Sequence, residues 1–177
     1  YAHVPWASKS QQAYDVEDLP KGSDKIALYL LGQQLLSEAG YEDVGMDHFA
    51  LRGDSLWSAY QNGLLHRNFM GYTTSASDVL IGLGVSAISD VFFAYRQNEK
   101  TLEAYYERLE KDEMPVFRGM DLAENEVIRR GHILDITCKG ATYNIESFIS
   151  ENEAFKLYKE SLVLDGLILT DDNSIEV

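Results

Sequence analysis

Residues 66–74 read HRNFMGYTT, and residues 82–89 read GLGVSAIS. The first stretch lies in a segment, 65–78, that is too polar and too rich in Gly, Ser and Thr for an ordinary core element, so it predicts a loop. An apolar run with two glycines, VLIGLGVSAI at 79–88, follows it. We expect this run to form a buried strand whose glycines let another backbone or a ligand come close.

The polar residues around Phe69 favour a ligand loop over simple packing. An adjacent Phe-Met pair such as Phe69 and Met70 is, by itself, usually part of a core. Here the polar flanks would lose hydrogen bonds if the loop merely packed. The glycines of GLG do not predict a phosphate site, because no G-x-G-x-x-G is complete and no GKS or GKT follows.

Outside this stretch, the patterning predicts a mixed α+β fold. Two helices are expected in the first third of the chain, at 24–39 after the cap Ser23 and at 55–62 after the cap Asp54. Three more are expected later: one from the cap Asn98 to 111, one that follows a capping box at Asp121 and Glu124 and ends near 137, and one at 152–164. Residues 41–50 and 115–120 should be extended, and 167–177 should form a hairpin that turns at 172–173. The helix at 24–39 and the strand leading into His48 are typical of half a βαβ unit.

Composition excludes several classes of function. The chain has 177 residues, with 15 Lys+Arg against 29 Asp+Glu and a net charge of −14, and it shows no basic cluster. Such a charge repels phosphate backbones, so we expect no nucleic acid partner. No apolar run approaches the roughly 20 residues that span a bilayer, and nothing resembles a signal peptide. We therefore expect no membrane partner. The single cysteine, which can form no internal disulfide, favours the reducing cytoplasm as the location.

Cys138 is the only cysteine in the chain. One cysteine excludes an internal disulfide and any Cys-rich metal site within this chain. Its neighbours place it near the end of a helix, where we expect a buried, unreactive thiol.

Several motifs, in order, carry a resemblance to a known family: YAH at 1–3, GMDHFA at 45–50, and the two stretches quoted first. They are similar to oxygen-independent coproporphyrinogen III oxidases. The similarity runs from Tyr1 to about Tyr106 and then weakens, although RGMDLAENEVIRR at 118–130 still resembles the family. The chain looks like the C-terminal portion of such an enzyme.

The resemblance implies a radical S-adenosylmethionine enzyme of haem and porphyrin biosynthesis. Such an enzyme takes electrons from a donor through a [4Fe–4S] cluster held by a C-x-x-x-C-x-x-C loop. It converts two propionates of coproporphyrinogen III to vinyl groups with loss of CO₂, giving protoporphyrinogen IX. With one cysteine this chain cannot contain that loop. We therefore expect a fragment that is inactive alone.

For the fold, the resemblance implies a partial (β/α) barrel closed by a mostly helical domain. We expect residues 1–95 to be the end of that barrel with its cofactor and substrate loops. Residues 96–177 should form the helical domain, of winged type, with its small terminal hairpin. A cut barrel leaves strand edges uncovered, so we expect self-association into a dimer or larger species.

Four positions match residues that contact S-adenosylmethionine in the family: Ala2, Phe69, Met70 and Ile88. Relatives often have glutamine where Met70 stands. A thioether cannot replace an amide's donor and acceptor, so only backbone contacts are expected there.

Two further residues are candidates for lining the site or binding substrate. His48 follows Asp47 at the end of the extended segment; alternatively, this pair anchors the strand to the next loop. Arg67 is a candidate cation for the substrate propionates, with an internal ion pair to Asp47 or Asp78 as the alternative. The helix macrodipole is enough to explain Arg129 and Arg130.

Two other functions stay open on the sequence alone. One is a haem chaperone related to the radical S-adenosylmethionine enzymes; retention of GMDHFA favours the oxidase over it. The other is a non-catalytic interaction module.

Overall fold

The structure is a computed structural model that describes residues 16–146, 153–171 and 173–177. The chain divides into two units, Tyr1–Glu42 and Asp43–Val177. Ala2, one of the expected cofactor contacts, lies outside the described residues. Within the described part, no helix combines the length and apolar character needed to cross a membrane.

The first unit contains the short helix η2 (Val16–Asp18) and the helix α1 (Ser23–Glu38). The predicted helix is confirmed, but its cap is not: Gly22 is the N-cap, and no side chain caps the helix. Apolar side chains of α1 remain exposed, among them Ile26 at 61% and Leu35 at 55%.

The strands β1 (Tyr41–Gly45) and β2 (His48–Leu51) form a two-stranded sheet. The prediction of one extended segment was wrong, because Met46 and Asp47 have φ values of 45° and 62° and turn the chain between the strands. Two-residue turns with positive φ suit the twist of a hairpin. The βαβ unit stays a prediction, since the chain before the helix at 24–39, where its first strand would come, lies mostly outside the described residues.

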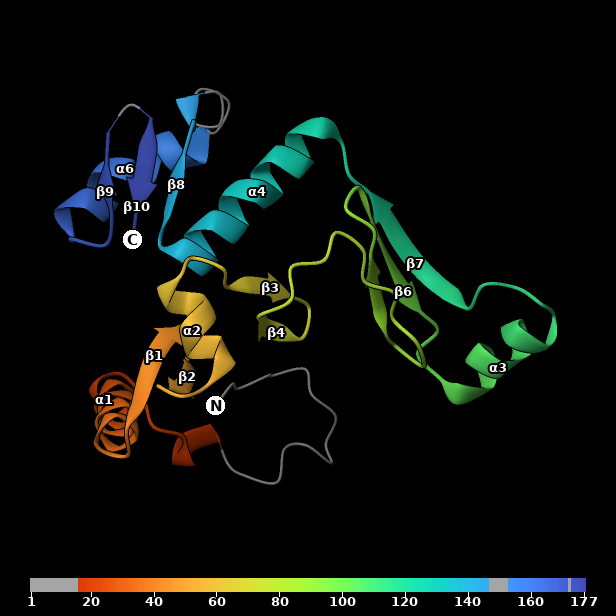
Figure 1. The fold of residues 1–177 in the computed structure, drawn as a ribbon, viewed down its shortest axis with the longest axis horizontal. Coiled ribbons are helices and arrows are strands. Elements are labelled where there is room, and N and C mark those ends of the chain that lie inside the picture. Colours follow the sequence, from red (N-terminus) through yellow and green to blue (C-terminus); the bar gives the residue numbers. More distant parts are fainter. Residues whose placement is uncertain (1–15, 147–152, 172) are drawn as a thin grey trace. The chain divides into compact units, whose positions relative to one another are not determined.

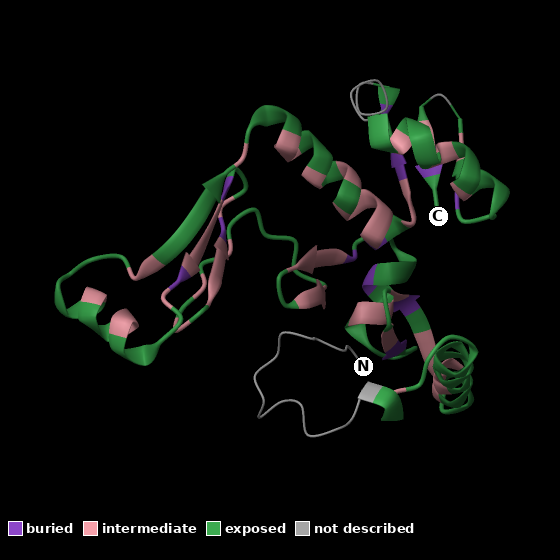
Figure 2. Ribbon diagram, turned by 180° about the vertical axis from the view of Figure 1, so that it is seen from behind, coloured by how far each residue is buried: buried purple, intermediate pink, exposed green. Residues whose placement is uncertain are grey.

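In the second unit, α2 (Ser55–Gln61), β3 (His66–Asn68), β4 (Gly71–Thr73) and α4 (Glu124–Lys139) surround a small core. Ala59, Leu65 and Cys138 are buried there. Figure 2 shows that most of the described chain is exposed or of intermediate burial, with few buried segments. The predicted cap of α2 is confirmed, since the Asp54 carboxylate accepts from Leu56 N at 2.7 Å. The segment predicted as a loop at 65–78 contains the β3–β4 hairpin.

A three-stranded antiparallel sheet, in the order β5-β6-β7, comes next (Figure 1). Its strands are β5 (Ile88–Asp90), β6 (Ala94–Asn98) and β7 (Val116–Asp121), and α3 (Leu102–Glu110) connects β6 to β7. The strand at 115–120 is therefore confirmed. Asn98 ends β6 and does not cap α3, whose cap is Thr101.

The buried strand predicted at 79–88 was wrong. Within 79–87 only Leu80 makes a β-bridge, to Asp90, and β5 begins at Ile88, the last residue of the run. Ile81 and Leu83 are 61% and 85% exposed. The apolar run is thus a surface loop beside the sheet, and its exposed side chains are available to a ligand or a partner.

The chain ends in a second three-stranded sheet, in the order β8-β10-β9. It comprises β8 (Ala141–Tyr143), β9 (Leu169–Thr170) and β10 (Ser174–Glu176), with α6 (Glu153–Leu164) between β8 and β9. Ile145, Ile168 and Ile175 form its core. The predicted terminal hairpin and the helix before it are confirmed.

The capping box predicted before α4 was wrong. The helix begins at Glu124, and it is Ala123 N that donates to the Glu126 carboxylate, at 2.8 Å. Asp121 ends β7 and pairs with Arg96. The mixed helix and strand fold is confirmed, and the described residues form no closed barrel. The barrel remnant, the winged description and the division at residue 95 stay predictions.

Candidate functional site

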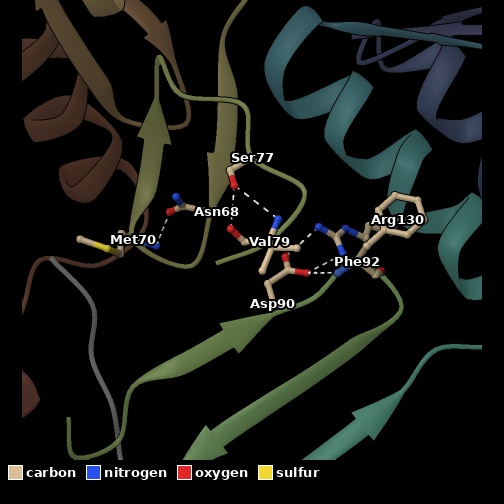
Figure 3. A network of polar contacts seen from close by, with 7 residues as sticks. All are labelled: Asn68, Met70, Ser77, Val79, Asp90, Phe92 and Arg130. Atoms are coloured by element: carbon tan, nitrogen blue, oxygen red, sulfur yellow. Dashed lines mark hydrogen bonds and ion pairs between the residues drawn. The ribbon is translucent and has the colours of Figure 1, made fainter. Parts of the chain in front are cut away.

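The β3–β4 hairpin presents Phe69 and Met70 at its tip. Asn68 pairs with Gly71 across the hairpin, and the Asn68 side-chain oxygen accepts from Met70 N at 2.8 Å (Figure 3). Phe69 is 52% exposed and Met70 is 89% exposed. The alternative that this pair belongs to the core is therefore wrong.

His48 supports the hairpin from β2. Its Nδ1 lies 2.8 Å from Met46 O, and its ring meets the Tyr72 ring edge-on, with centroids 4.8 Å apart. Gly71 has φ +122°, and a Cβ there would lie 3.1 Å from His48 Nε2. His48 thus packs behind the hairpin and lines neither of the pockets described below, which fits the anchoring alternative.

Tyr72 ties the hairpin to α4. Its hydroxyl donates to the carbonyl oxygen of Thr137. Burial raises the pKa of Tyr72, which keeps the phenol protonated and able to donate. The base of the hairpin is therefore held while its tip stays exposed.

A pocket of about 380 Å³, here called the tip pocket, lies between the hairpin tip and the 80–88 loop. It brings together three residues predicted to contact a cofactor: Phe69, Met70 and Ile88. No ionisable side chain lines it. The full lining is Phe69, Met70, Leu80, Ile81, Gly82, Leu83, Ser86, Ala87 and Ile88.

Close backbone packing shapes the wall of the tip pocket at Gly82. A Cβ at this position would lie 2.6 Å from Ile88 O. Only glycine therefore allows the 80–88 loop to fold back on the start of β5. The predicted close approach is confirmed at Gly82, where the approaching group is another segment of backbone.

Asn98 holds the same loop and was missed by the sequence reasoning, which assigned it to a helix cap. Its side-chain Nδ2 donates to Gly82 O at 3.0 Å and to Gly84 O at 2.9 Å. The residue is 6% exposed. The sequence did contain a signal for this role. An asparagine amide at the end of a strand can donate to carbonyl oxygens of a nearby Gly-rich loop that have no partner in a β-sheet.

A second pocket of about 270 Å³, here called the arginine pocket, adjoins the first through Phe69, which lines both. The Phe69 ring meets the Tyr95 ring edge-on, with centroids 5.2 Å apart. Its lining is Arg67, Asn68, Phe69, Asp90, Tyr95, Arg130, Ile133 and Leu134.

Asp90 and Arg130 form a two-armed ion pair in this pocket (Figure 3). Arg130 Nη1 also donates to Phe92 O at 2.8 Å, and Asp90 Oδ1 accepts from Phe92 N at 3.1 Å. Arg130 lies in the middle of α4, so the helix macrodipole does not explain it as the sequence suggested. Its role is to bind β5 to α4.

Arg67 lines the arginine pocket without a charged partner. Its Nε is buried and makes no hydrogen bond, and no described carboxylate forms an ion pair with the side chain. The expected alternatives, Asp47 and Asp78, therefore do not neutralise it in this structure.

Cys138 is 5% exposed, and burial raises the pKa of its thiol. A protonated, covered sulfur is a poor nucleophile and a poor metal ligand, as expected. Among the residues that the structure describes, no group of three or more His, Cys, Asp and Glu side chains could hold a metal ion.

No family model matches the chain. The chain does, in contrast, resemble individual proteins of known sequence. It is 35% identical over its whole length to the oxygen-independent coproporphyrinogen III oxidase of Escherichia coli strain K12, and 35% identical to that of Pseudomonas aeruginosa. It is 39% identical, over 78% of its length, to the enzyme of the same name from Synechocystis. The resemblance seen in the sequence is confirmed.

A solved structure agrees with these relatives. The chain matches a structure described as coproporphyrinogen III oxidase (HemN) from Escherichia coli, a radical SAM enzyme, with a TM-score of 0.89 and 34% identity over 100% of the chain. The chain spans 42% of that structure, and 30% and 40% of the Synechocystis and E. coli proteins.

Proposed function

We propose that this chain, homologous over its whole length to oxygen-independent coproporphyrinogen III oxidases, is the C-terminal portion of such an enzyme. The full protein would oxidatively decarboxylate two propionates of coproporphyrinogen III to vinyl groups, giving protoporphyrinogen IX. One structural observation carries the proposal: Phe69, Met70 and Ile88, which the family resemblance assigns to S-adenosylmethionine, line one pocket.

The residues of the tip pocket fit the adenosyl part of S-adenosylmethionine. The pocket is apolar, contains an aromatic ring and has the volume of a small-molecule site, about 300–1,000 Å³. A flat base can stack on or pack beside Phe69 there. The backbone of Met70 contributes to the wall whatever its side chain. When bound next to a [4Fe–4S] cluster, S-adenosylmethionine supplies the radical that abstracts hydrogen from substrate.

The described residues do not provide for the charged methionyl part of that cofactor or for the cluster. No ionisable group lines the tip pocket, and Cys138 is buried elsewhere. We propose that these parts are held by other segments of the full protein, together with the electron donor's docking site.

The finer fold assignments belong to the same proposal. Residues up to about 95 would be the end of a partial (β/α) barrel, and residues 96–177 a domain of winged type. The three-stranded sheet β8-β10-β9 with α6 supports the second assignment.

The test uses the full-length protein, with its cluster reconstituted anaerobically. We expect it to produce protoporphyrinogen IX from coproporphyrinogen III, and Phe69→Ala to weaken S-adenosylhomocysteine binding at least tenfold. Phe93→Ala is the matched control, because Phe93 is 63% exposed and lines neither pocket.

Two results would count against the proposal. An intact cluster with bound cofactor but no decarboxylation defeats the assigned reaction, and stoichiometric haem binding under those conditions favours the chaperone. Equal losses of S-adenosylhomocysteine affinity in Phe69→Ala and Phe93→Ala defeat the assignment of the tip pocket.

A further inference from the structure

The geometry points to the arginine pocket as a carboxylate site: we propose that it receives one propionate arm of the tetrapyrrole substrate, with Arg67 as the residue that binds the carboxylate. The identity of the arm rests on the proposed function. The pocket, its charge and its lining are observations of this chain alone.

The charge balance of the pocket leaves one cation available. Arg130 and Asp90 neutralise each other, and both oxygens of Asp90 are bound, one by two donors and one by Arg130 Nη2. Arg67 forms no ion pair with a described carboxylate, and its Nε has no hydrogen-bond partner among the described residues. The pocket therefore carries a local charge of about +1 in a protein whose net charge is −14. The negative charge of the whole chain repels anions, so the local positive charge makes this pocket a place where an anion can still bind.

The unpaired, buried Nε of Arg67 favours a ligand that can accept a hydrogen bond. A buried donor without an acceptor costs free energy, and a carboxylate accepts from a guanidinium through two parallel bonds. A carboxylate bound at Arg67 would satisfy that donor or its neighbouring Nη groups. Asp90 lines the same pocket, but it pairs with Arg130 and forms no ion pair with Arg67.

Size and lining select a short apolar arm that ends in a charge. At about 270 Å³ the arginine pocket is smaller than the about 300–1,000 Å³ of sites that enclose whole drug-sized ligands, so a tetrapyrrole ring does not fit inside. Besides Arg67, Asn68 and the paired Asp90 and Arg130, the lining is apolar or aromatic: Phe69, Tyr95, Ile133 and Leu134. Methylene groups pack on such walls while a terminal carboxylate reaches the guanidinium.

The position of the pocket suits an arm of the substrate. Phe69 lines both pockets, so an arm bound at Arg67 lies next to the site proposed for the adenosyl group. S-adenosylmethionine also carries a carboxylate, and it is the competing source of the same anion. The test must therefore measure the two ligands separately.

The experiment uses the full-length protein and two probes: coproporphyrin III, the stable tetracarboxylate, by fluorescence quenching, and S-adenosylhomocysteine by calorimetry. Arg67→Gln should weaken coproporphyrin binding about tenfold to a hundredfold, the loss expected for charge-assisted hydrogen bonds. Arg67→Lys should lose less, because it keeps the charge without the planar fork. S-adenosylhomocysteine affinity should change less than twofold in both variants.

Arg129→Gln is the matched control: it removes the same charge from an exposed position on α4 that lines neither pocket. It should bind coproporphyrin like the wild type. Wild-type affinity in both Arg67 variants, or an equal loss in Arg129→Gln, would overturn the inference. So would a loss confined to S-adenosylhomocysteine, which would assign Arg67 to the cofactor. A wild-type protein that binds no porphyrin and makes no protoporphyrinogen defeats the proposed function itself, a separate outcome.

Discussion

Asp90 on β5 and Arg130 on α4 face each other through two short contacts, Nη1–Oδ1 at 2.8 Å and Nη2–Oδ2 at 2.7 Å. Their side chains are only 12% and 16% exposed. The guanidinium carbon also lies 5.4 Å from the centroid of the Tyr95 ring. This pair of side chains thus links β5 to α4, and both residues line the arginine pocket.

Removing one member of this pair should be costly. Arg130→Ala leaves the Asp90 carboxylate covered and unpaired, so we expect a loss of about 2–4 kcal/mol in the free energy of unfolding, slightly below the range for fully buried pairs. Urea denaturation measures it. Arg129→Ala, on the exposed face of α4, is the control and should cost less than 1 kcal/mol. Equal costs in the two variants would show that the pair does not join β5 to α4.

Gly82→Ala should disturb the tip pocket. The new Cβ would lie 2.6 Å from Ile88 O, a backbone atom that cannot rotate away, so we expect a loss of about 1–3 kcal/mol in stability and weaker S-adenosylhomocysteine binding. Gly53→Ala is the control, since nothing lies within 4 Å of a Cβ there. Wild-type binding by Gly82→Ala would show that the loop can move without loss of the pocket.

The thiol of Cys138 gives a prediction about pH. Burial raises its pKa in the folded protein, so the unfolded chain ionises first, from about pH 8.5. The stability due to the neutral thiol is fully present below that pH and is lost as the pH rises toward the folded pKa. Cys138→Ala should therefore flatten the decline in the free energy of unfolding between about pH 8 and pH 10. An unchanged decline would assign it to other groups, with Tyr72 and Tyr95, whose pKa values burial also raises, as the first to test.

Self-association, expected from the sequence, stays a prediction, and the edge strand β7 supports it. This strand forms one edge of its sheet, and Phe117 and Met120 on it are 50% and 51% exposed. An exposed apolar edge favours pairing between chains, so we predict a dimer or larger species of this 177-residue chain. Light scattering measures its mass. Phe117→Lys should shift the distribution toward monomer, and a monodisperse wild-type monomer would contradict the prediction.

Local signals in the sequence predicted much of the fold. The helix that follows the Asp54 cap, the strand expected at 115–120 and the terminal hairpin all depend on residues a few positions apart. Two errors arose where local signals misled. The apolar composition of 79–88 suggested a buried strand. Residues 41–50 were expected to be extended throughout, whereas positive φ values at Met46 and Asp47 make a turn between two strands.

The contacts that build the two pockets could not be predicted in the same way. Asp90 and Arg130 are 40 residues apart, and Tyr72 reaches Thr137 across 65 residues. Such pairings depend on how sheets and helices pack, which periodicity does not specify. The family resemblance did place Phe69, Met70 and Ile88 in one site. It gave no reason to connect Arg67 with Arg130.

Asn98 provides the sharpest test of how the tip pocket is held. Asn98→Ala removes two hydrogen bonds to the carbonyls of Gly82 and Gly84 at a position that is 6% exposed. Gly82 O then loses the Asn98 donor, and Gly84 O keeps only the longer bond from Ala87 N, at 3.4 Å. We expect a loss of about 1–3 kcal/mol in the free energy of unfolding and faster amide hydrogen exchange in residues 80–88.

Asn62→Ala is the matched control, because the Asn62 amide also donates to a backbone carbonyl, that of Ser58, but at an exposed helix end. It should change stability by less than 1 kcal/mol and leave exchange in 80–88 unaltered. If Asn98→Ala exchanges like the wild type there, the loop is held by its own backbone and by Ser89, whose hydroxyl accepts from Gly82 N at 3.0 Å.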